Sequence, residues 1–98
     1  MNATYISIVG FEQYFGMEPF KIGALLTCRK DPDNEYDDEA IAVFRSGTGK
    51  VGFIANSVHT KANGTSSAGR IYDSVGDKFT VTVRFTTRNC VIAEITDK

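Results

Sequence analysis

The chain has 98 residues, of which 42% are hydrophobic and 23% are charged, and its formal net charge is −1. This length suffices for one domain with one core, and the composition is too apolar for a disordered chain. The near-neutral charge excludes bulk binding to DNA through a broad basic face, but it permits a small local site for a strand end. No apolar run approaches the roughly 18 residues of a membrane span.

The N-terminus passes directly into a strand pattern without a signal-peptide pattern, so we expect a cytoplasmic protein with no membrane partner. Cys28 and Cys90 each fall within a strand-like run. Two buried free thiols are the favoured interpretation, and a disulfide between them remains open. Together with the single His59 they lack the close-spaced ligand pairs of a zinc site.

The first half of the chain is rich in β-branched and aromatic runs that end at glycine or at turn residues. Gly10 ends the first run and is followed by an aromatic loop, while Gly52 within the fourth run allows a bulge or a close backbone approach. We therefore expect strands over residues 5–9, 24–30, 40–45 and 51–54.

Helix is expected only between Ala55 and Val75, where the hydrophobic period changes. Asn56 or Ser57 is a candidate cap for a short helix over Val58–Ala62. Thr65, Ser66 or Ser67 is a candidate cap for a second helix, with apolar residues spaced by three and four.

The clearest pattern is the period-two alternation from Phe79 to Phe85, which predicts a half-buried strand with both phenylalanines in the core. Cys90–Thr96 is expected to return as its partner strand. About six strands with one helical insertion, between the fourth and fifth strands, predict a mainly β protein built as a small closed or partly open barrel. We expect residues 1–98 to form a single domain.

Six of the twelve carboxylates stand between Asp31 and Glu39, in a turn that Pro32 makes rigid. Tyr36 is the only aromatic residue there, and the turn is either a ligand-binding loop or a solvated connection between two strands. Calcium is not expected, because a calcium loop that began at Asp31 would need glycine in place of Tyr36 and an acid in place of Ala42.

Catalysis is poorly supported. His59 has no adjacent nucleophile, and the glycine-rich segment 46–50 lacks the spacing of a phosphate-binding loop. We therefore expect a protein that is not an enzyme and that needs no cofactor. Exposed aromatic rings beside a few basic groups instead favour stacking on unpaired bases, with Tyr14 and Tyr36 as candidates.

The sequence resembles the HIRAN domain family. The resemblance lies in the loop motif Gly10-x-x-x-Tyr14-x-Gly16, in Val51-Gly52-Phe53-Ile54, and most specifically in the acidic turn, Asp31-Pro32-x-Asn34-x-Tyr36-Asp37-x-x-Ala40-Ile41-x-Val43. It is close over residues 6–54 and looser beyond, where the chain is similar to the small free-standing bacterial members.

This resemblance implies an OB-like barrel that binds the free 3′-hydroxyl end of single-stranded DNA. Tyr36 would stack on the terminal base, Asp37 would accept a hydrogen bond from the terminal hydroxyl, and Asn34 would bond to the strand or hold the loop. The family also implies a role in DNA repair, with single-stranded DNA or DNA ends as partners and a helicase or nuclease acting in trans.

Two departures from the DNA-binding eukaryotic pattern bear on this expectation. Glu12 and Gln13 stand where an arginine and a tyrosine occur, and Phe53 stands where a histidine occurs. The expected nucleic-acid-binding residues are Gln13, Tyr14, Lys30, Asn34, Tyr36, Asp37, Lys50 and Phe53, and no metal ligands are expected. The alternative is a protein-interaction or regulatory adaptor that keeps the barrel without binding DNA.

Overall fold

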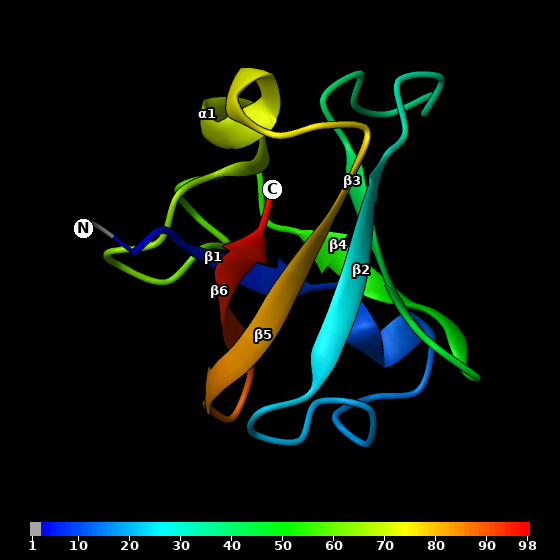
Figure 1. The fold of residues 1–98 in the computed structure, drawn as a ribbon, viewed down its shortest axis with the longest axis vertical. Helices are drawn as coiled ribbons and strands as arrows, with labels where there is room; N and C mark the ends of the chain where they lie inside the picture. Colours follow the sequence, from blue (N-terminus) through cyan, green and yellow to red (C-terminus); the bar gives the residue numbers. More distant parts are fainter. Residues whose placement is uncertain (1–2) are drawn as a thin grey trace.

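Six antiparallel strands form a closed barrel in the computed structural model, which describes residues 3–98. They are β1 (Tyr5–Val9), β2 (Leu25–Lys30), β3 (Ile41–Arg45), β4 (Gly49–Ile54), β5 (Lys78–Thr86) and β6 (Val91–Asp97). Around the barrel they follow the order β1-β4-β3-β2-β5-β6, and β6 pairs with β1 to close it (Figure 1). The expected mainly β, OB-like barrel is confirmed, with its one α-helix between β4 and β5 in the described part of the chain.

The core lies inside the barrel because alternate side chains of each strand point inward. In β2, Leu26 and Cys28 are buried while Thr27 and Arg29 are exposed. Both Cys28 and Cys90 are buried and free, so the favoured interpretation of the cysteines is confirmed. Burial raises the pKa of the Cys28 thiol to about 12, because the apolar core disfavours the thiolate.

Only the second of the two expected helices forms. It is α1 (Ala68–Ile71), capped by the Ser67 hydroxyl, which accepts a hydrogen bond from the backbone of Arg70, and the 3-10 helix η2 (Tyr72–Ser74) follows it. Within residues 3–98, no helix is both long enough and apolar enough to span a membrane.

The prediction of a helix over Val58–Ala62 was wrong. The segment makes a single turn, in which Thr60 N and Lys61 N both donate to Ser57 O. The backbone of Ala62 donates instead to the hydroxyl of Ser7 on β1, so tertiary contacts take the hydrogen bonds that a helix would need.

Two other predictions need correction. The 3-10 helix η1 (Phe11–Gln13) lies outside the segment to which helix was assigned, and it starts after Gly10, whose φ of +75° suits glycine. Phe85 is 57% exposed and is not in the core. The register of β5 against β6 shifts between Val83 and Phe85, which reverses the alternation and turns Phe85 outward.

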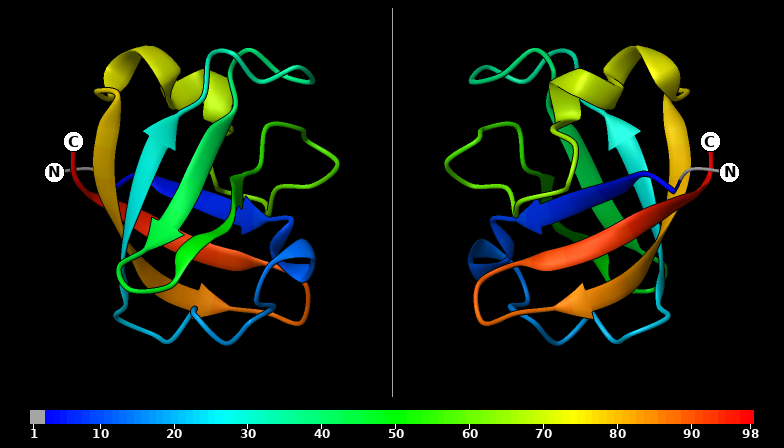
Figure 2. Two further views of the ribbon diagram at one scale, coloured as in Figure 1. Left: turned by 90° about the vertical axis from the view of Figure 1, so that its right-hand side faces the viewer. Right: turned by 90° about the vertical axis from the view of Figure 1, so that its left-hand side faces the viewer.

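The acidic turn, residues 31–40, and α1 lie at the same end of the barrel (Figures 1 and 2). The segment between β4 and α1 is held against β1 by a hydrogen bond of 2.8 Å between the Ser7 and Thr65 hydroxyls. The C-terminal end of β4 therefore lies between three segments: the acidic turn, the segment between β4 and α1, and the loop after β1.

Candidate nucleic-acid interface

A cavity of about 400 Å³ lies between the loop after β1, the acidic turn and the end of β4. The structure brings six of the eight predicted binding residues together in its lining: Gln13, Tyr14, Asn34, Tyr36, Asp37 and Phe53. Val9, Ala40, Ile54, Ala55 and Asn56 complete the wall. Residues from three separate connections therefore meet at one concave site.

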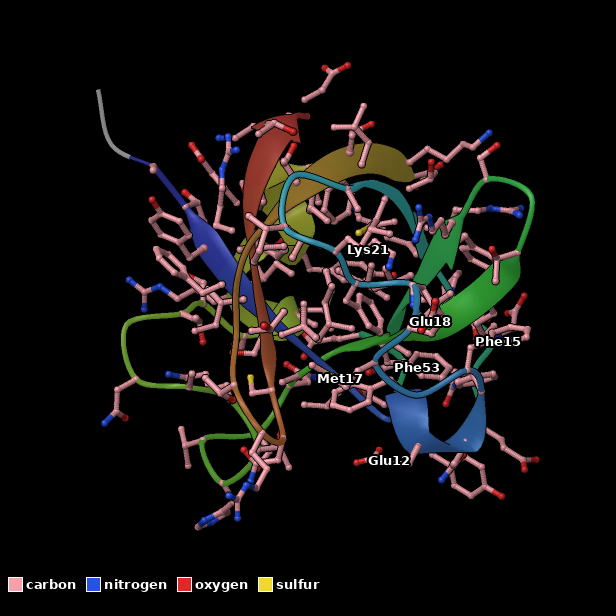
Figure 3. The ribbon with its side chains drawn as sticks, turned by 90° about the horizontal axis from the view of Figure 1, so that it is seen from below. Glu12, Phe15, Met17, Glu18, Lys21 and Phe53 are labelled. Carbon is pink, nitrogen blue, oxygen red and sulfur yellow. The ribbon has the colours of Figure 1, made fainter. Side chains whose placement is uncertain are left out.

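The loop after β1 is held in place by its buried aromatic residues. Phe11 and Phe20 pack edge to face with their ring centroids 5.7 Å apart, and both are buried. Arg45 on β3 donates a hydrogen bond of 2.6 Å to Pro19 O and so ties the loop to the barrel. Figure 3 shows this loop beside Phe53 of β4, and the centroids of the Tyr14 and Phe53 rings are 6.3 Å apart.

Asn34 shapes the acidic turn from within. Its amide oxygen accepts hydrogen bonds from the backbone of Tyr36, at 2.9 Å, and of Asp37, at 3.1 Å. Its amide nitrogen donates to Asp31 Oδ2 at 3.2 Å. The Tyr36 side chain projects outward and is 88% exposed. Asn34 thus fixes the backbone that presents the Tyr-Asp pair, as a side-chain-capped turn does.

Asp37 is oriented by two donors. Its Oδ1 accepts from the backbone of Glu39 and its Oδ2 accepts from the amide of Asn56, both at 2.9 Å. A carboxylate offers about four acceptor positions, so Asp37 retains capacity for a hydroxyl donor in the cavity.

Asn56 is a site residue that the sequence analysis missed. Its amide oxygen accepts from the backbone of Gly69 at 2.7 Å while its nitrogen donates to Asp37, so it links α1 to the acidic turn. The sequence did mark Asn56 as a candidate helix cap, but for the helix over Val58–Ala62, which does not form. It in fact bonds to the first turn of α1.

The two predicted lysines differ in placement, and neither lines the cavity. Lys50 Nζ lies 5.1 Å from the centroid of the Phe53 ring, so this cation stands beside the cavity wall. Lys30 is directed elsewhere, because its ammonium donates to Val75 O at 2.8 Å and lies over the Tyr72 ring. Glu12 is absent from the cavity lining and borders a separate hollow with His59 and Lys61.

Despite the density of carboxylates in the acidic turn, no group of three or more His, Cys, Asp or Glu side chains converges as a possible metal site within residues 3–98.

The fold and the site together define a class of protein, the small OB-like barrel, here with a cavity lined by aromatic rings and the Asp37 carboxylate. The family model for the HIRAN domain matches residues 1–95, and the chain belongs to this family. The crystal structure of the HIRAN domain of human HLTF superposes with a TM-score of 0.68 at 18% identity, over 98% of this chain and 74% of that chain.

A crystal structure of a protein from Lactobacillus plantarum gives a TM-score of 0.63 at 16% identity, over 95% of this chain and 92% of that chain. At these identities the likeness establishes the fold. No curated protein sequence matches the chain.

Proposed function

We propose that this protein is a non-catalytic nucleic-acid-binding module whose cavity receives the free 3′-hydroxyl end of a single DNA strand. The observation that supports this most strongly is the convergence of the exposed Tyr36 ring, the Asp37 carboxylate and the Tyr14 and Phe53 rings on one cavity. Membership of the HIRAN family supports the same assignment.

The terminal nucleoside suits this site in size and chemistry. A cavity of about 400 Å³ is within the usual range for small-molecule sites. Tyr36 can cover one face of the terminal base, because its ring is exposed and its backbone is held by Asn34. Stacking of one base on an aromatic side chain contributes about 1–3 kcal/mol.

Asp37 accounts for the preference for a hydroxyl. Its carboxylate can accept a hydrogen bond from the 3′-hydroxyl, an interaction with a charged acceptor worth about 1.5–3 kcal/mol. A 3′-phosphate at the same place would face this carboxylate and the rest of the acidic turn as like charges.

The cation beside the cavity comes from β4. This chain has Glu12 where DNA-binding relatives have an arginine, yet Glu12 lies outside the cavity lining. Lys50, next to Phe53, offers a positive charge to the phosphate that precedes the terminal nucleoside. Few phosphate contacts imply micromolar or weaker binding that decreases only gently with salt. Such a module would serve a helicase or nuclease acting in trans, as in DNA repair.

The test is fluorescence anisotropy with labelled oligonucleotides that differ only in a 3′-hydroxyl or a 3′-phosphate. The expected result is tighter binding of the hydroxyl form. Tyr36→Ala should weaken binding of both forms about tenfold, the loss of roughly 1.4 kcal/mol of stacking, while Tyr36→Phe retains it. Asp37→Ala should chiefly abolish the difference between the two ends. Equal binding of both ends by the natural protein contradicts the proposal.

A protein-interaction adaptor is the second candidate, and exposed apolar side chains outside the cavity favour it. Ile22, in the turn before β2, is 64% exposed, and Leu25, the first residue of β2, is 67% exposed. If no oligonucleotide binds up to about a millimolar concentration, this candidate replaces strand-end binding.

A further inference from the structure

Outside the cavity, cations and aromatic rings alternate in a row on the outer face of β2, β3 and β4. The guanidinium carbon of Arg29 lies 5.5 Å from the centroid of the Phe44 ring, and Lys50 Nζ lies 6.0 Å from the same centroid. Lys50 Nζ is also 5.1 Å from the centroid of Phe53, which lines the cavity. The row therefore runs Arg29, Phe44, Lys50, Phe53 and ends at the proposed strand-end site.

Strand register explains why these side chains share one face. Arg29 pairs with Ala42, and Ala42 pairs with Phe53, so the three form one line across β2, β3 and β4. Phe44 pairs with Lys50 in a second line. Neighbouring strands lie about 4.8 Å apart, so each line is a close succession of side chains. The left view of Figure 2 has β2 and β3 in front.

A shallow hollow of about 220 Å³ lies within this row. Ala42 lines it between Arg29, Phe44 and Lys50, and its small side chain leaves room between the larger neighbours. Asp31 and Lys30 also border the hollow. The Asp31 carboxylate accepts from Asn34, and the Lys30 ammonium is directed to Val75 O, so Arg29 and Lys50 are its available cations.

Neither Arg29 nor Lys50 forms an ion pair among the described residues, although Asp31 borders the same hollow. The ion pairs among residues 3–98 are Lys21 with Glu18 and Arg84 with Glu94. Two unpaired cations packed on an aromatic ring suit a ligand with phosphates and flat bases, since arginine and lysine bind phosphate and the ring can stack.

We propose that the row from Phe53 to Arg29 is a second subsite, which binds the nucleotides preceding the 3′ end, with phosphates at Lys50 and Arg29 and a base against Phe44. This inference rests on the proposed function of the cavity. Charge sets the direction of the strand: the terminus without a phosphate enters the cavity beside Asp37 and the acidic turn, and the phosphorylated backbone leaves over the cationic row.

The experiment compares oligodeoxythymidines of two and six nucleotides, both with a free 3′-hydroxyl, by anisotropy at about 50 and 200 mM salt. For two phosphate contacts on a single strand the slope of log affinity against log salt is about −1.4, or roughly a sevenfold loss across this range. The natural protein should show this slope with the six-nucleotide strand and bind it more tightly than the two-nucleotide strand.

In the Arg29→Ala/Lys50→Ala double variant, we expect the slope to approach zero and the length dependence to disappear. The preference for a 3′-hydroxyl over a 3′-phosphate should remain, because Tyr36 and Asp37 are intact. Lys50→Arg keeps the charge and should keep the slope. Arg88→Ala removes an exposed cation from the β5–β6 turn and is the control that should bind like the natural protein.

The outcomes separate the two proposals. A double variant that keeps both the slope and the length dependence overturns the second subsite and leaves strand-end binding standing. If the natural protein binds 3′-hydroxyl and 3′-phosphate ends equally, or binds neither, strand-end binding is overturned and this inference with it. Melting temperatures of all variants within a few degrees of the natural protein exclude unfolding as the cause.

Discussion

Asn34 is the residue that makes the acidic turn a defined structure. Its single amide group accepts two backbone hydrogen bonds, from Tyr36 and Asp37, and donates one to Asp31. In the proposed complex Asn34 acts through the Tyr-Asp pair, because its bonds hold the backbone on which the exposed Tyr36 ring stands.

This role predicts a specific pattern for two substitutions. Asn34→Ala removes the acceptor of both backbone donors and should weaken strand binding by about 1–2 kcal/mol, roughly tenfold, as loss of a cap does. Asn34→Asp keeps an acceptor oxygen and should recover part of the affinity, although it adds a charge beside Asp31. Anisotropy titrations measure both, and equal loss in the two variants would contradict a positioning role.

Cys28 predicts a dependence of stability on pH. Its folded-state pKa is raised to about 12, while the pKa of an unfolded cysteine thiol is about 8.5. Between these values the unfolded chain loses the thiol proton and the folded chain keeps it, so stability decreases as pH rises. The contribution is fully present below about pH 8.5 and is lost by as much as about 1.4 kcal/mol per pH unit above it.

Urea denaturation from pH 8 to 11 measures this effect. The control is Cys28→Ala, which has no thiol at this position, so the stability difference between natural protein and variant should shrink as pH rises. Parallel curves for the two proteins would show that Cys28 does not couple folding to pH.

At the scale of elements, the contact between β1 and β4 sets one wall of the cavity. Val9 pairs with Phe53, and both residues line the cavity. A Cβ atom at Gly52 would lie 2.9 Å from the backbone oxygen of Val9 and 3.0 Å from the Ile8 side chain. The close backbone approach that Gly52 was expected to allow is therefore present in the structure.

Gly52→Ala should separate β1 from β4 and destabilise the fold by about 1–3 kcal/mol, the usual cost of overpacking. Gly76→Ala is the matched control, because a Cβ there would meet its nearest atom at 3.6 Å, an ordinary contact. Thermal melts should show a clear decrease for Gly52→Ala and little change for Gly76→Ala. Equal melting temperatures would contradict the close approach.

Local sequence patterns predicted the strands well, but they failed where tertiary contacts determine whether a side chain is buried or a segment is helical. The alternation through Phe79 gave β5 to within a few residues, but it assigned Phe85 to the core because a register shift leaves no trace in composition. The helix expected over Val58–Ala62 failed because the Ser7 hydroxyl, about 55 residues away in sequence, takes a hydrogen bond from its end.

At the scale of the whole molecule, the order of the strands around the barrel assembles the site. Tyr14, Asp37, Phe53 and Asn56 come from three stretches of sequence, and pairing of β4 with both β1 and β3 brings them around one cavity. The strand pattern predicted a closed or partly open barrel without the order of its strands, and the OB-like barrel was what the family resemblance implied. Asn56 and the row at Arg29 were missed because only the register places them. We propose that residues 1–98 form a single domain.

The most direct test of strand-end binding is a 15N–1H NMR titration of the protein with a tetranucleotide that carries a free 3′-hydroxyl. We predict that the largest shifts occur at the backbone amides of Tyr36 and Asp37 and at the side-chain amide of Asn56, and that a 3′-phosphate reduces them. Shifts confined to the hollow beside His59, or to Ile22 and Leu25, with the cavity resonances unchanged, would contradict the account.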